Sequence, residues 1–365
     1  MRTMHVGVVG CGEVAQRVYL PEFHRLHGKA SLVAVCDRVE ERARAAQQRF
    51  GARTYYTDLD RFLRESDAEV VVNLTPHQAH MPVSMAALAA GRHVYTEKPL
   101  AQSVDDATQL IETAQRHRVK LACAPVMLLL PTMKRWQHLL HQGTIGRVTF
   151  ARAQLLAPAT WDGFSADQAW YFAAGSGPLM DGGVYALTAL TGLLGPALRV
   201  SAMAGTVMSE HVIGHGPAAG RRLRLEVEDS AHLHLDFGGL FAAFDVSWCV
   251  QASRNVTFEA YGEYGTLSGD PTYANTLIHI FRSATGWTVE EPASRWPRDD
   301  DWVQGVVHLV DCVRHDTAPV NSATHARHVL DIMLTALRSA REGRALALQT
   351  TFRSRSRNEA EGTRQ

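Results

Sequence analysis

Hydrophobic and polar positions follow two different patterns along the chain. In the first 124 residues, short apolar runs with strand character alternate with longer stretches of helical periodicity. The strand-like runs lie at residues 6–9, 32–36, 70–74, 93–96 and 121–123. The helical stretches lie near residues 13–27, 38–50, 58–65, 77–90 and 103–117. This alternation predicts an α/β fold with a doubly wound parallel sheet, and we expect an N-terminal Rossmann domain over residues 1–124.

The second pattern begins near residue 148, where several segments have a period of two residues. Residues 232–237 read His-Leu-His-Leu-Asp-Phe, as expected for a strand with one exposed face. Strands are expected at residues 148–156, 200–207, 223–237, 240–248, 256–261 and 277–281, and helices near 177–194, 300–315 and 322–342. These elements predict an α+β domain over residues 125–352, built on a mostly antiparallel sheet. The polar, charged tail at residues 353–365 is expected to be disordered.

The composition is that of a globular protein without a nucleic-acid or membrane partner. The 365 residues are enough for two domains, and 46% of them are hydrophobic. The 37 basic and 37 acidic residues balance, which argues against binding to nucleic acid or to an anionic membrane. No apolar run approaches the ~20 residues that span a bilayer. The five cysteines are scattered, so we expect free thiols and a cytoplasmic location.

A glycine-rich loop follows the first predicted strand. Gly10-Cys11-Gly12-Glu13-Val14-Ala15 has the form G-x-G-x-x-A and opens a helical stretch. Glycines in this position permit a tight turn and close backbone approach to a pyrophosphate, which the N–H groups of the following helix attract. The alternative is an ordinary strand–helix turn. The context favours a dinucleotide-binding loop, with NAD or NADP as the cofactor.

Asp37 closes the second predicted strand, 22 residues after Ala15. A carboxylate at about this spacing binds the ribose hydroxyls of the adenosine, and it repels the 2′-phosphate of NADP. We therefore expect NAD to be preferred. Arg38 follows directly and is suited to a 2′-phosphate, so NADP stays possible. The structural alternative for Asp37 is a helix N-cap.

Two further strand ends carry polar residues that are predicted to border the cofactor. Thr75 and Pro76 follow the strand predicted at residues 70–74, and His77 and His80 open the next helix, where capping or loop packing is the alternative role. Lys98 follows the strand predicted at residues 93–96. An unpaired ammonium at the end of a buried strand is costly to desolvate, and this edge of a parallel sheet is where α/β proteins bind ligands. Lys98 is therefore a candidate catalytic residue.

Asp181 and Tyr185 form a second candidate catalytic pair. Four residues apart on one predicted helix, they share a face. Oxidation of a secondary alcohol needs a base within hydrogen-bond reach of the hydroxyl, and a neighbouring ammonium such as Lys98 favours ionisation of a phenol. Gly182 and Gly183 are poor helix formers, which suggests that a nicotinamide or substrate packs closely against them. The alternative is an amphipathic helix with a core tyrosine.

Together these motifs resemble the Gfo/Idh/MocA oxidoreductases. The resemblance rests on the glycine loop, Thr75-Pro76-x-x-x-His80, Glu97-Lys98-Pro99 and Asp181-x-Gly183-x-Tyr185, and it extends to Phe352. It implies a C-terminal domain with a large open sheet that often mediates homodimers or homotetramers. It also implies NAD(P)-dependent redox chemistry on a sugar, sugar nucleotide or cyclitol, with Glu97 beside the cofactor. By position, Lys98 corresponds to the family's catalytic or substrate-orienting lysine and Asp181 to its substrate-binding aspartate.

Tyr185 departs from part of this family. Inositol-dehydrogenase-like members carry histidine at this position, whereas the glucose–fructose oxidoreductase, dihydrodiol dehydrogenase and 3-ketosugar reductase branches carry tyrosine. The departure argues against a simple inositol dehydrogenase and makes Tyr185 the expected acid/base. Two other functions stay open: an NAD-dependent enzyme that cleaves glycosides by transient oxidation, and a non-catalytic NAD(P)-sensing protein.

Two further groups of side chains are candidates for binding a substrate or a metal. Trp161 and Trp170 precede the Asp181 helix and are suited to the apolar faces of sugar rings, with packing as the alternative. Eighteen histidines raise the question of a metal, and His211 and His215 stand four residues apart. No segment combines three ligands at the spacing of a catalytic zinc site, so no metal is expected.

Overall fold

The fold is described by a computed structural model, which covers residues 2–158, 172–213, 219–254, 257–291 and 301–353. The chain divides into two compact units. The first comprises Met1–Val126 and Asp301–Arg327, and the second Met127–Asp300 and His328–Gln365. The division lies two residues beyond the expected boundary at residue 124. Residues 301–327 pack with the first unit through contacts between residues far apart in the sequence, which local periodicity cannot predict.

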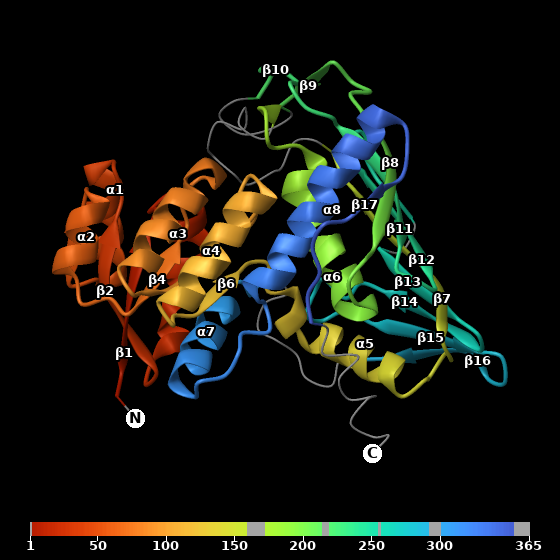
Figure 1. The fold of residues 1–365 in the computed structure, drawn as a ribbon, viewed down its shortest axis with the longest axis horizontal. Coiled ribbons are helices and arrows are strands. Elements are labelled where there is room, and N and C mark those ends of the chain that lie inside the picture. The colour runs from red at the N-terminus through yellow and green to blue at the C-terminus, as the bar shows by residue number, and fades with distance from the viewer. Residues whose placement is uncertain (1, 159–171, 214–218, 255–256, 292–300, 354–365) are drawn as a thin grey trace. The chain divides into compact units, whose positions relative to one another are not determined.

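The first unit is built on a six-stranded parallel sheet in the order β3-β2-β1-β4-β5-β6 (Figure 1). Its strands are β1 (Met4–Val9), β2 (Ala30–Cys36), β3 (Thr54–Tyr56), β4 (Val70–Asn73), β5 (His93–Thr96) and β6 (Leu121–Cys123). This order is that of a Rossmann fold: successive strands are added on one side of β1 up to β3, and then on the other side from β4 onward. Ligands bind where the side changes, between β1 and β4, beyond the carboxyl ends of the strands.

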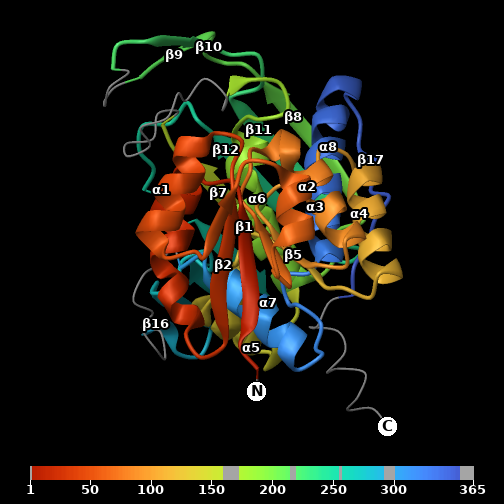
Figure 2. The same ribbon diagram turned by 90° about the vertical axis from the view of Figure 1, so that its left-hand side faces the viewer.

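Helices flank the sheet on both sides (Figure 2). They are η1 (Ala15–Tyr19), η2 (Leu20–Leu26), α1 (Glu40–Phe50), α2 (Leu59–Glu65), η3 (His77–Ala79), α3 (His80–Ala89), α4 (Val104–Arg116) and α7 (Gln304–Arg314). The helix expected over residues 13–27 is therefore split into a π-helical turn, η1, and a 3₁₀ segment, η2. Pro21 near the start of η2 lacks the N–H that a continuous α-helix would use.

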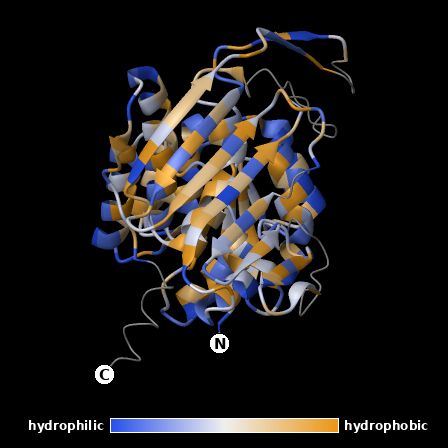
Figure 3. Ribbon diagram, turned by 90° about the vertical axis from the view of Figure 1, so that its right-hand side faces the viewer, coloured by the Kyte–Doolittle hydropathy of each residue, from blue (hydrophilic) through white to orange (hydrophobic). Residues whose placement is uncertain are grey.

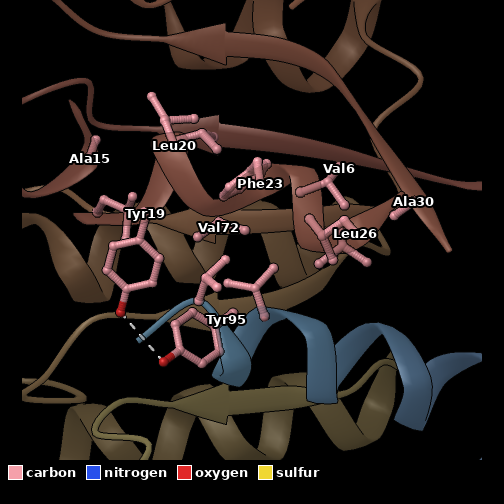
Figure 4. Packing of buried hydrophobic residues seen from close by; sticks show 14 of the residues in the cluster. Val6, Ala15, Tyr19, Leu20, Phe23, Leu26, Ala30, Val72 and Tyr95 are labelled. Atoms are coloured by element: carbon pink, nitrogen blue, oxygen red, sulfur yellow. Dashed lines mark hydrogen bonds between the residues drawn. The ribbon is translucent and has the colours of Figure 1, made fainter. Parts of the chain in front are cut away.

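Apolar side chains from β1, η1, η2 and β4 form the core of the first unit (Figure 4). Tyr19 and Tyr95 are fully buried there, and their hydroxyl oxygens lie 3.5 Å apart. Gly305 of α7 packs directly on the Tyr95 ring, so a larger residue would overlap it. The Arg25 guanidinium pairs with Asp301, and Lys29 Nζ lies 2.6 Å from Asp311 Oδ2. These contacts explain why residues 301–327 belong to this unit.

The second unit is built on a nine-stranded sheet in the order β16-β15-β14-β13-β7-β12-β11-β8-β17. The strands are β7 (Val148–Leu156), β8 (Arg199–Gly205), β11 (Ser230–Asp236), β12 (Phe241–Ser247), β13 (Phe258–Gly262), β14 (Gly265–Gly269), β15 (Ile278–Arg282), β16 (Gly286–Glu290) and β17 (Leu346–Ala347). Only β7 and β12 pair in parallel, so the sheet is mostly antiparallel. The predicted fold class is confirmed.

Helices cover one face of this sheet, while the face seen in Figure 3 carries no helix among the described residues. The helical segments are η4 (Met127–Leu129), α5 (Pro131–His141), η6 (Leu179–Gly183), α6 (Val184–Leu194) and α8 (Ala323–Glu342). The strand expected at residues 223–237 is divided, because β10 (Arg222–Arg224) turns away to pair with β9 (Glu210–Val212) in a separate hairpin. Within the described residues, no helix is long and apolar enough to cross a membrane.

Candidate functional site

The glycine loop lies where β1 ends, beside the end of β4. Gly10 has φ +93°, and a Cβ at this position would lie 2.6 Å from the Leu74 carbonyl carbon and 2.7 Å from the Thr75 nitrogen. Only glycine fits there, because the φ is left-handed and the backbone of the next strand is in contact. A Cβ at Gly12, in contrast, would meet nothing within 4 Å. The open space in front of Gly12 fits the close approach of a dinucleotide phosphate.

Asp37 connects this loop to the end of β2. Its Oδ2 accepts the Cys11 N–H at 2.8 Å, and its Oδ1 accepts the Val39 N–H at 2.8 Å. The second bond orders the turn before α1, but Asp37 is not the N-cap of that helix, because α1 begins at Glu40 with Val39 as its N-cap and no side-chain cap. Each carboxylate oxygen has a second lone pair, so both remain able to accept a ribose hydroxyl. The structural role and the predicted cofactor role of Asp37 are thus compatible, and Arg38 beside it is exposed.

Hydrogen bonds and an ion pair among residues 11–17 hold the rest of the loop. Gln16 Nε2 donates to the Cys11 carbonyl at 2.8 Å, while Glu13 pairs with Arg17 one turn later. The Cys11 side chain is fully buried and points at the Cys36 carbonyl. Burial and the nearby Asp37 carboxylate raise the pKa of Cys11 to about 12, so the thiol is neutral. Cys11 and Val14 would therefore contribute to cofactor binding through backbone shape.

A buried polar network joins the ends of β4 and β5. Asn73 Oδ1 accepts the Thr75 hydroxyl at 2.6 Å, and Asn73 Nδ2 donates to Ser84 Oγ at 3.0 Å. The His80 ring lies between two carbonyls, with Nδ1 2.7 Å from Pro99 O and Nε2 2.8 Å from Thr75 O. Its burial lowers the pKa of His80, although the two carbonyls favour the protonated form. His80 therefore joins the Thr75-Pro76 turn to the Lys98-Pro99 turn. His77, also buried, opens η3 beside it.

Glu97 braces the turn that carries Lys98. Its carboxylate accepts the Tyr19 hydroxyl at 2.5 Å and the Lys98 N–H at 2.9 Å. The Glu97 side chain is buried, whereas Lys98 is partly exposed at the end of β5. These internal bonds position the Lys98 backbone. A direct contact of Glu97 with the cofactor stays a prediction.

Asp181 and Tyr185 stand out on their helical segment by exposure. From Ser176 to Thr191 every other residue is buried, and only these two side chains reach the surface of the second unit partly. Asp181 lies in η6, a π-helical turn, and Tyr185 lies in the first turn of α6. Widened π turns occur frequently at functional sites. Tyr185 is thus less buried than its neighbours on this segment.

The glycines of this segment have a different role from the expected one. A Cβ at Gly182 would overlap Leu155 of β7, and a Cβ at Gly183 would lie 2.9 Å from Leu179 Cδ1 and 3.3 Å from Phe244 Cε1. The bulky groups that require glycine are thus side chains of the protein, and not a nicotinamide or substrate. The two glycines let the helix lie close to the sheet.

Sequence reasoning missed several residues that shape these regions. Asn73 positions Thr75, and Tyr19 positions Glu97. In the sequence, Asn73 looks like an ordinary strand end and Tyr19 like an ordinary core residue, so neither was singled out. Glu228 is far from Asp181 in sequence, yet its Oε1 would lie 3.0 Å from a Cβ at Gly177, where the Asp181 segment begins. Desolvation raises the pKa of Glu228 to about 7. Trp161 and Trp170 lie outside the described residues.

Known proteins share both halves of this architecture. The oxidoreductase family with an NAD-binding Rossmann fold matches residues 4–124, and the GFO/IDH/MocA C-terminal domain matches residues 133–268. A dTDP-3,4-didehydro-2,6-dideoxy-alpha-D-glucose 3-reductase of Streptomyces violaceoruber is 30% identical over 280 residues, which are 76% of each chain. The D-glucoside 3-dehydrogenase of Escherichia coli K12 is 27% identical over 200 residues, 54% of this chain and 56% of that protein.

The fold is also found among solved structures. The crystal structure of an aldose-aldose oxidoreductase from Caulobacter crescentus, complexed with glycerol, has a TM-score of 0.79 and 24% identity, and the match covers 95% of this chain and 100% of that one. The fold and the glycine loop define an NAD-binding oxidoreductase. The chain belongs to the Gfo/Idh/MocA family, as the motifs of its sequence predicted.

Proposed function

We propose that this enzyme interconverts a secondary alcohol and a ketone on a sugar, sugar nucleotide or cyclitol. The observation that carries the proposal is the exposure of Asp181 and Tyr185 on an otherwise buried segment, within the motif Asp181-x-Gly183-x-Tyr185. The two relatives named above are a 3-reductase of a dTDP-sugar and a 3-dehydrogenase of D-glucosides. They favour a sugar ring as the substrate.

Tyr185, Asp181 and Lys98 have different roles in proton transfer and in orienting the substrate. The Gly10–Ala15 loop and Asp37 would hold NAD, which would supply the acceptor for a hydride from the carbinol carbon, or as NADH the hydride for the ketone. In the oxidation, Tyr185 takes the hydroxyl proton, and in the reduction it gives the proton back. Asp181 accepts a hydrogen bond from a substrate hydroxyl and orients the ring. Lys98 supplies a positive charge that favours the phenolate of Tyr185 and the developing alkoxide.

Two substitutions test these roles. Tyr185→Phe should lower kcat by about 10²–10⁴-fold, the range for loss of an acid/base group. Lys98→Ala should lower kcat by about 10²–10³-fold, the range for loss of one group that stabilises developing charge. NADH binding, followed by fluorescence titration, should be retained in both. Lys134→Ala and Tyr264→Phe change the same residue types at exposed positions and should keep wild-type turnover. Undiminished turnover in Lys98→Ala would refute the assignment.

The substrate panel decides between net redox chemistry and the other functions of this fold. Polyols, ketosugars, glycosides and dTDP-sugars are supplied with NAD and with NADP in parallel. Formation or consumption of NADH supports the proposal. Release of an aglycone with no net change in NADH absorbance shows glycoside cleavage by transient oxidation. Tight NADH binding with no conversion of any compound shows a sensing role.

We further propose that the chain forms homodimers or homotetramers through its nine-stranded sheet. On the face without helices, an aromatic row crosses the strands in register: Trp287 pairs with Phe281, Tyr261 with Phe150, and Phe150 with Phe241. Thr266 of β14 interrupts the row between Phe281 and Tyr261. Trp287 is 57% and Phe241 60% exposed in the single chain, and exposed aromatic groups of this kind are typical of protein interfaces. A reducing, cytoplasmic compartment is also proposed, supported by five free cysteines.

A further inference from the structure

Three side chains with metal-binding atoms meet at the base of the β9–β10 hairpin, in the second unit. A ring nitrogen of His211, a carboxylate oxygen of Asp229 and Sγ of Cys249 all lie within 4.8 Å of one another. They come from three segments: His211 from β9, Asp229 from the residue before β11, and Cys249 from the residues that follow β12. None of the three has a role in the proposed redox reaction.

His211 points an unpaired nitrogen into this cluster. The residue is 7% exposed, and its Nε2 is buried without a hydrogen-bond partner among the described residues. Asp229 Oδ2 lies 3.8 Å away, beyond hydrogen-bond length. The ring is stacked on Phe172, with centroids 5.5 Å apart and an interplanar angle of 23°. A buried polar atom without a partner destabilises the folded state, and a bound ligand that contacts Nε2 would remove this cost.

Asp229 is held in the orientation that a metal ligand needs. Its side chain is fully buried, with Oδ1 accepting the Val207 N–H at 2.8 Å and Oδ2 accepting the Met208 N–H at 2.7 Å. Each oxygen keeps a lone pair for a further partner. Backbone donors that fix a carboxylate in this way are typical of the outer shell of metal sites.

We infer that His211, Asp229 and Cys249 form a zinc site. Imidazole, carboxylate and thiolate are the three ligand types that zinc accepts together, whereas magnesium and calcium select oxygen. Tetrahedral zinc with ligands at about 2.0–2.3 Å places its donor atoms about 3.3–3.8 Å apart, so the cluster needs to contract by about 1 Å. The ion balances the charges of one carboxylate and one thiolate, and a further donor completes the four-coordinate shell.

The zinc would fasten the β9–β10 hairpin to the main sheet, where β11 begins and β12 ends. Among the described strands, β9 and β10 pair with each other and with no other strand, and Figures 1 and 2 show them apart from the nine-stranded sheet. The described residues give them a small core cluster of Phe172, Ile213, Leu223 and Trp248. A metal that joins three segments at this point supplies the cross-link that so small a core lacks.

The test uses the full chain, freed of metal with a chelator and titrated with zinc chloride by calorimetry. Wild type should bind one zinc per chain. Cys249→Ser and His211→Asn should weaken binding by more than about 100-fold, beyond the 10–100-fold cost of losing an outer-shell partner. Cys312→Ser is the matched control. Cys312 Sγ also lies near a histidine, 3.4 Å from His308 Nε2, but that nitrogen already accepts the Val320 N–H.

Cobalt(II) provides a second readout that needs no variant. Cobalt in the proposed site should give a thiolate-to-cobalt charge-transfer band and the strong visible bands of tetrahedral coordination. Binding without the thiolate band, or zinc affinity unchanged in Cys249→Ser, shows adventitious binding to other histidines and overturns the proposal. Absence of zinc binding to the wild-type chain overturns it as well.

Discussion

At the scale of single residues, we propose that Asp37 combines a structural role with cofactor binding in one carboxylate. Its two oxygens accept the Cys11 and Val39 N–H groups, and each keeps a lone pair for a ribose hydroxyl of the proposed cofactor. Asp37→Asn keeps one carbonyl oxygen as an acceptor and removes the charge that repels a 2′-phosphate. We expect the ratio of NAD to NADP affinity to fall at least tenfold, about 1.4 kcal/mol. Fluorescence titration with both reduced cofactors measures the ratio, and an unchanged value contradicts the role of Asp37.

His80 makes the folded state sensitive to acid. Burial lowers the pKa of His80 below its ordinary value of 6.5. As the pH falls through 6.5, the unfolded chain therefore takes up a proton that the folded chain resists, and stability is lost. His80→Gln cannot titrate, so its free energy of unfolding should decline less between pH 7.5 and pH 5, measured by urea denaturation. Ser84→Ala, which removes a neighbouring hydrogen bond of Asn73, should shift stability by a pH-independent amount.

At the scale of elements, the π-helical turn η6 depends on contact with the sheet. A methyl group at Gly182 overlaps Leu155, so Gly182→Ala should destabilise the protein by about 1–3 kcal/mol. The double variant with Leu155→Ala should recover part of that loss, which a double-mutant cycle detects. Gly205→Ala is the control, because a Cβ there meets nothing within 4 Å. Equal losses in the two single variants contradict the packing explanation.

The same elements show which features the sequence reveals. Strands β1, β2, β4, β5 and β6 were predicted within a few residues, because fully buried parallel strands are continuous apolar runs. The short strand β3 and the helix α5 were missed. In β3 only Tyr56 is buried, so its sequence carries almost no hydrophobic signal. The helix α5 begins at Pro131, and a proline can either end an element or open the first turn of a helix, so the sequence alone does not locate this start.

The residues of the candidate sites also differ in whether the sequence alone reveals them. Gly10, Asp37 and Lys98 were found because each belongs to a motif with a fixed distance from a strand end. His211, Asp229 and Cys249 were not connected, although His211 was noticed, because their association depends on two hairpin turns and on β11 pairing with β12. Ligands from three separate segments leave no spacing for a sequence pattern to detect.

At the scale of the whole molecule, the uncovered sheet face predicts self-association. Phe241 lies in the aromatic row of that face, and a charge at this position would be buried in an interface between copies. We expect Phe241→Glu to reduce the mass measured by light scattering to that of a single chain. Val39→Glu, at an exposed position in the first unit, should leave the mass unchanged. A monomeric wild-type protein contradicts the proposal.

The return of residues 301–327 to the first unit also affects the order of events during synthesis. Tyr95 and the Arg25 guanidinium have their partners in Gly305 and Asp301, which the ribosome adds about 175 residues after Val126. At 5–20 residues per second, this delay is roughly 10–35 s. The nascent Rossmann sheet therefore waits with one flank open until residues 301–327 have been synthesised. A nascent chain that stops before residue 301 lacks the segment that completes the NAD-binding unit.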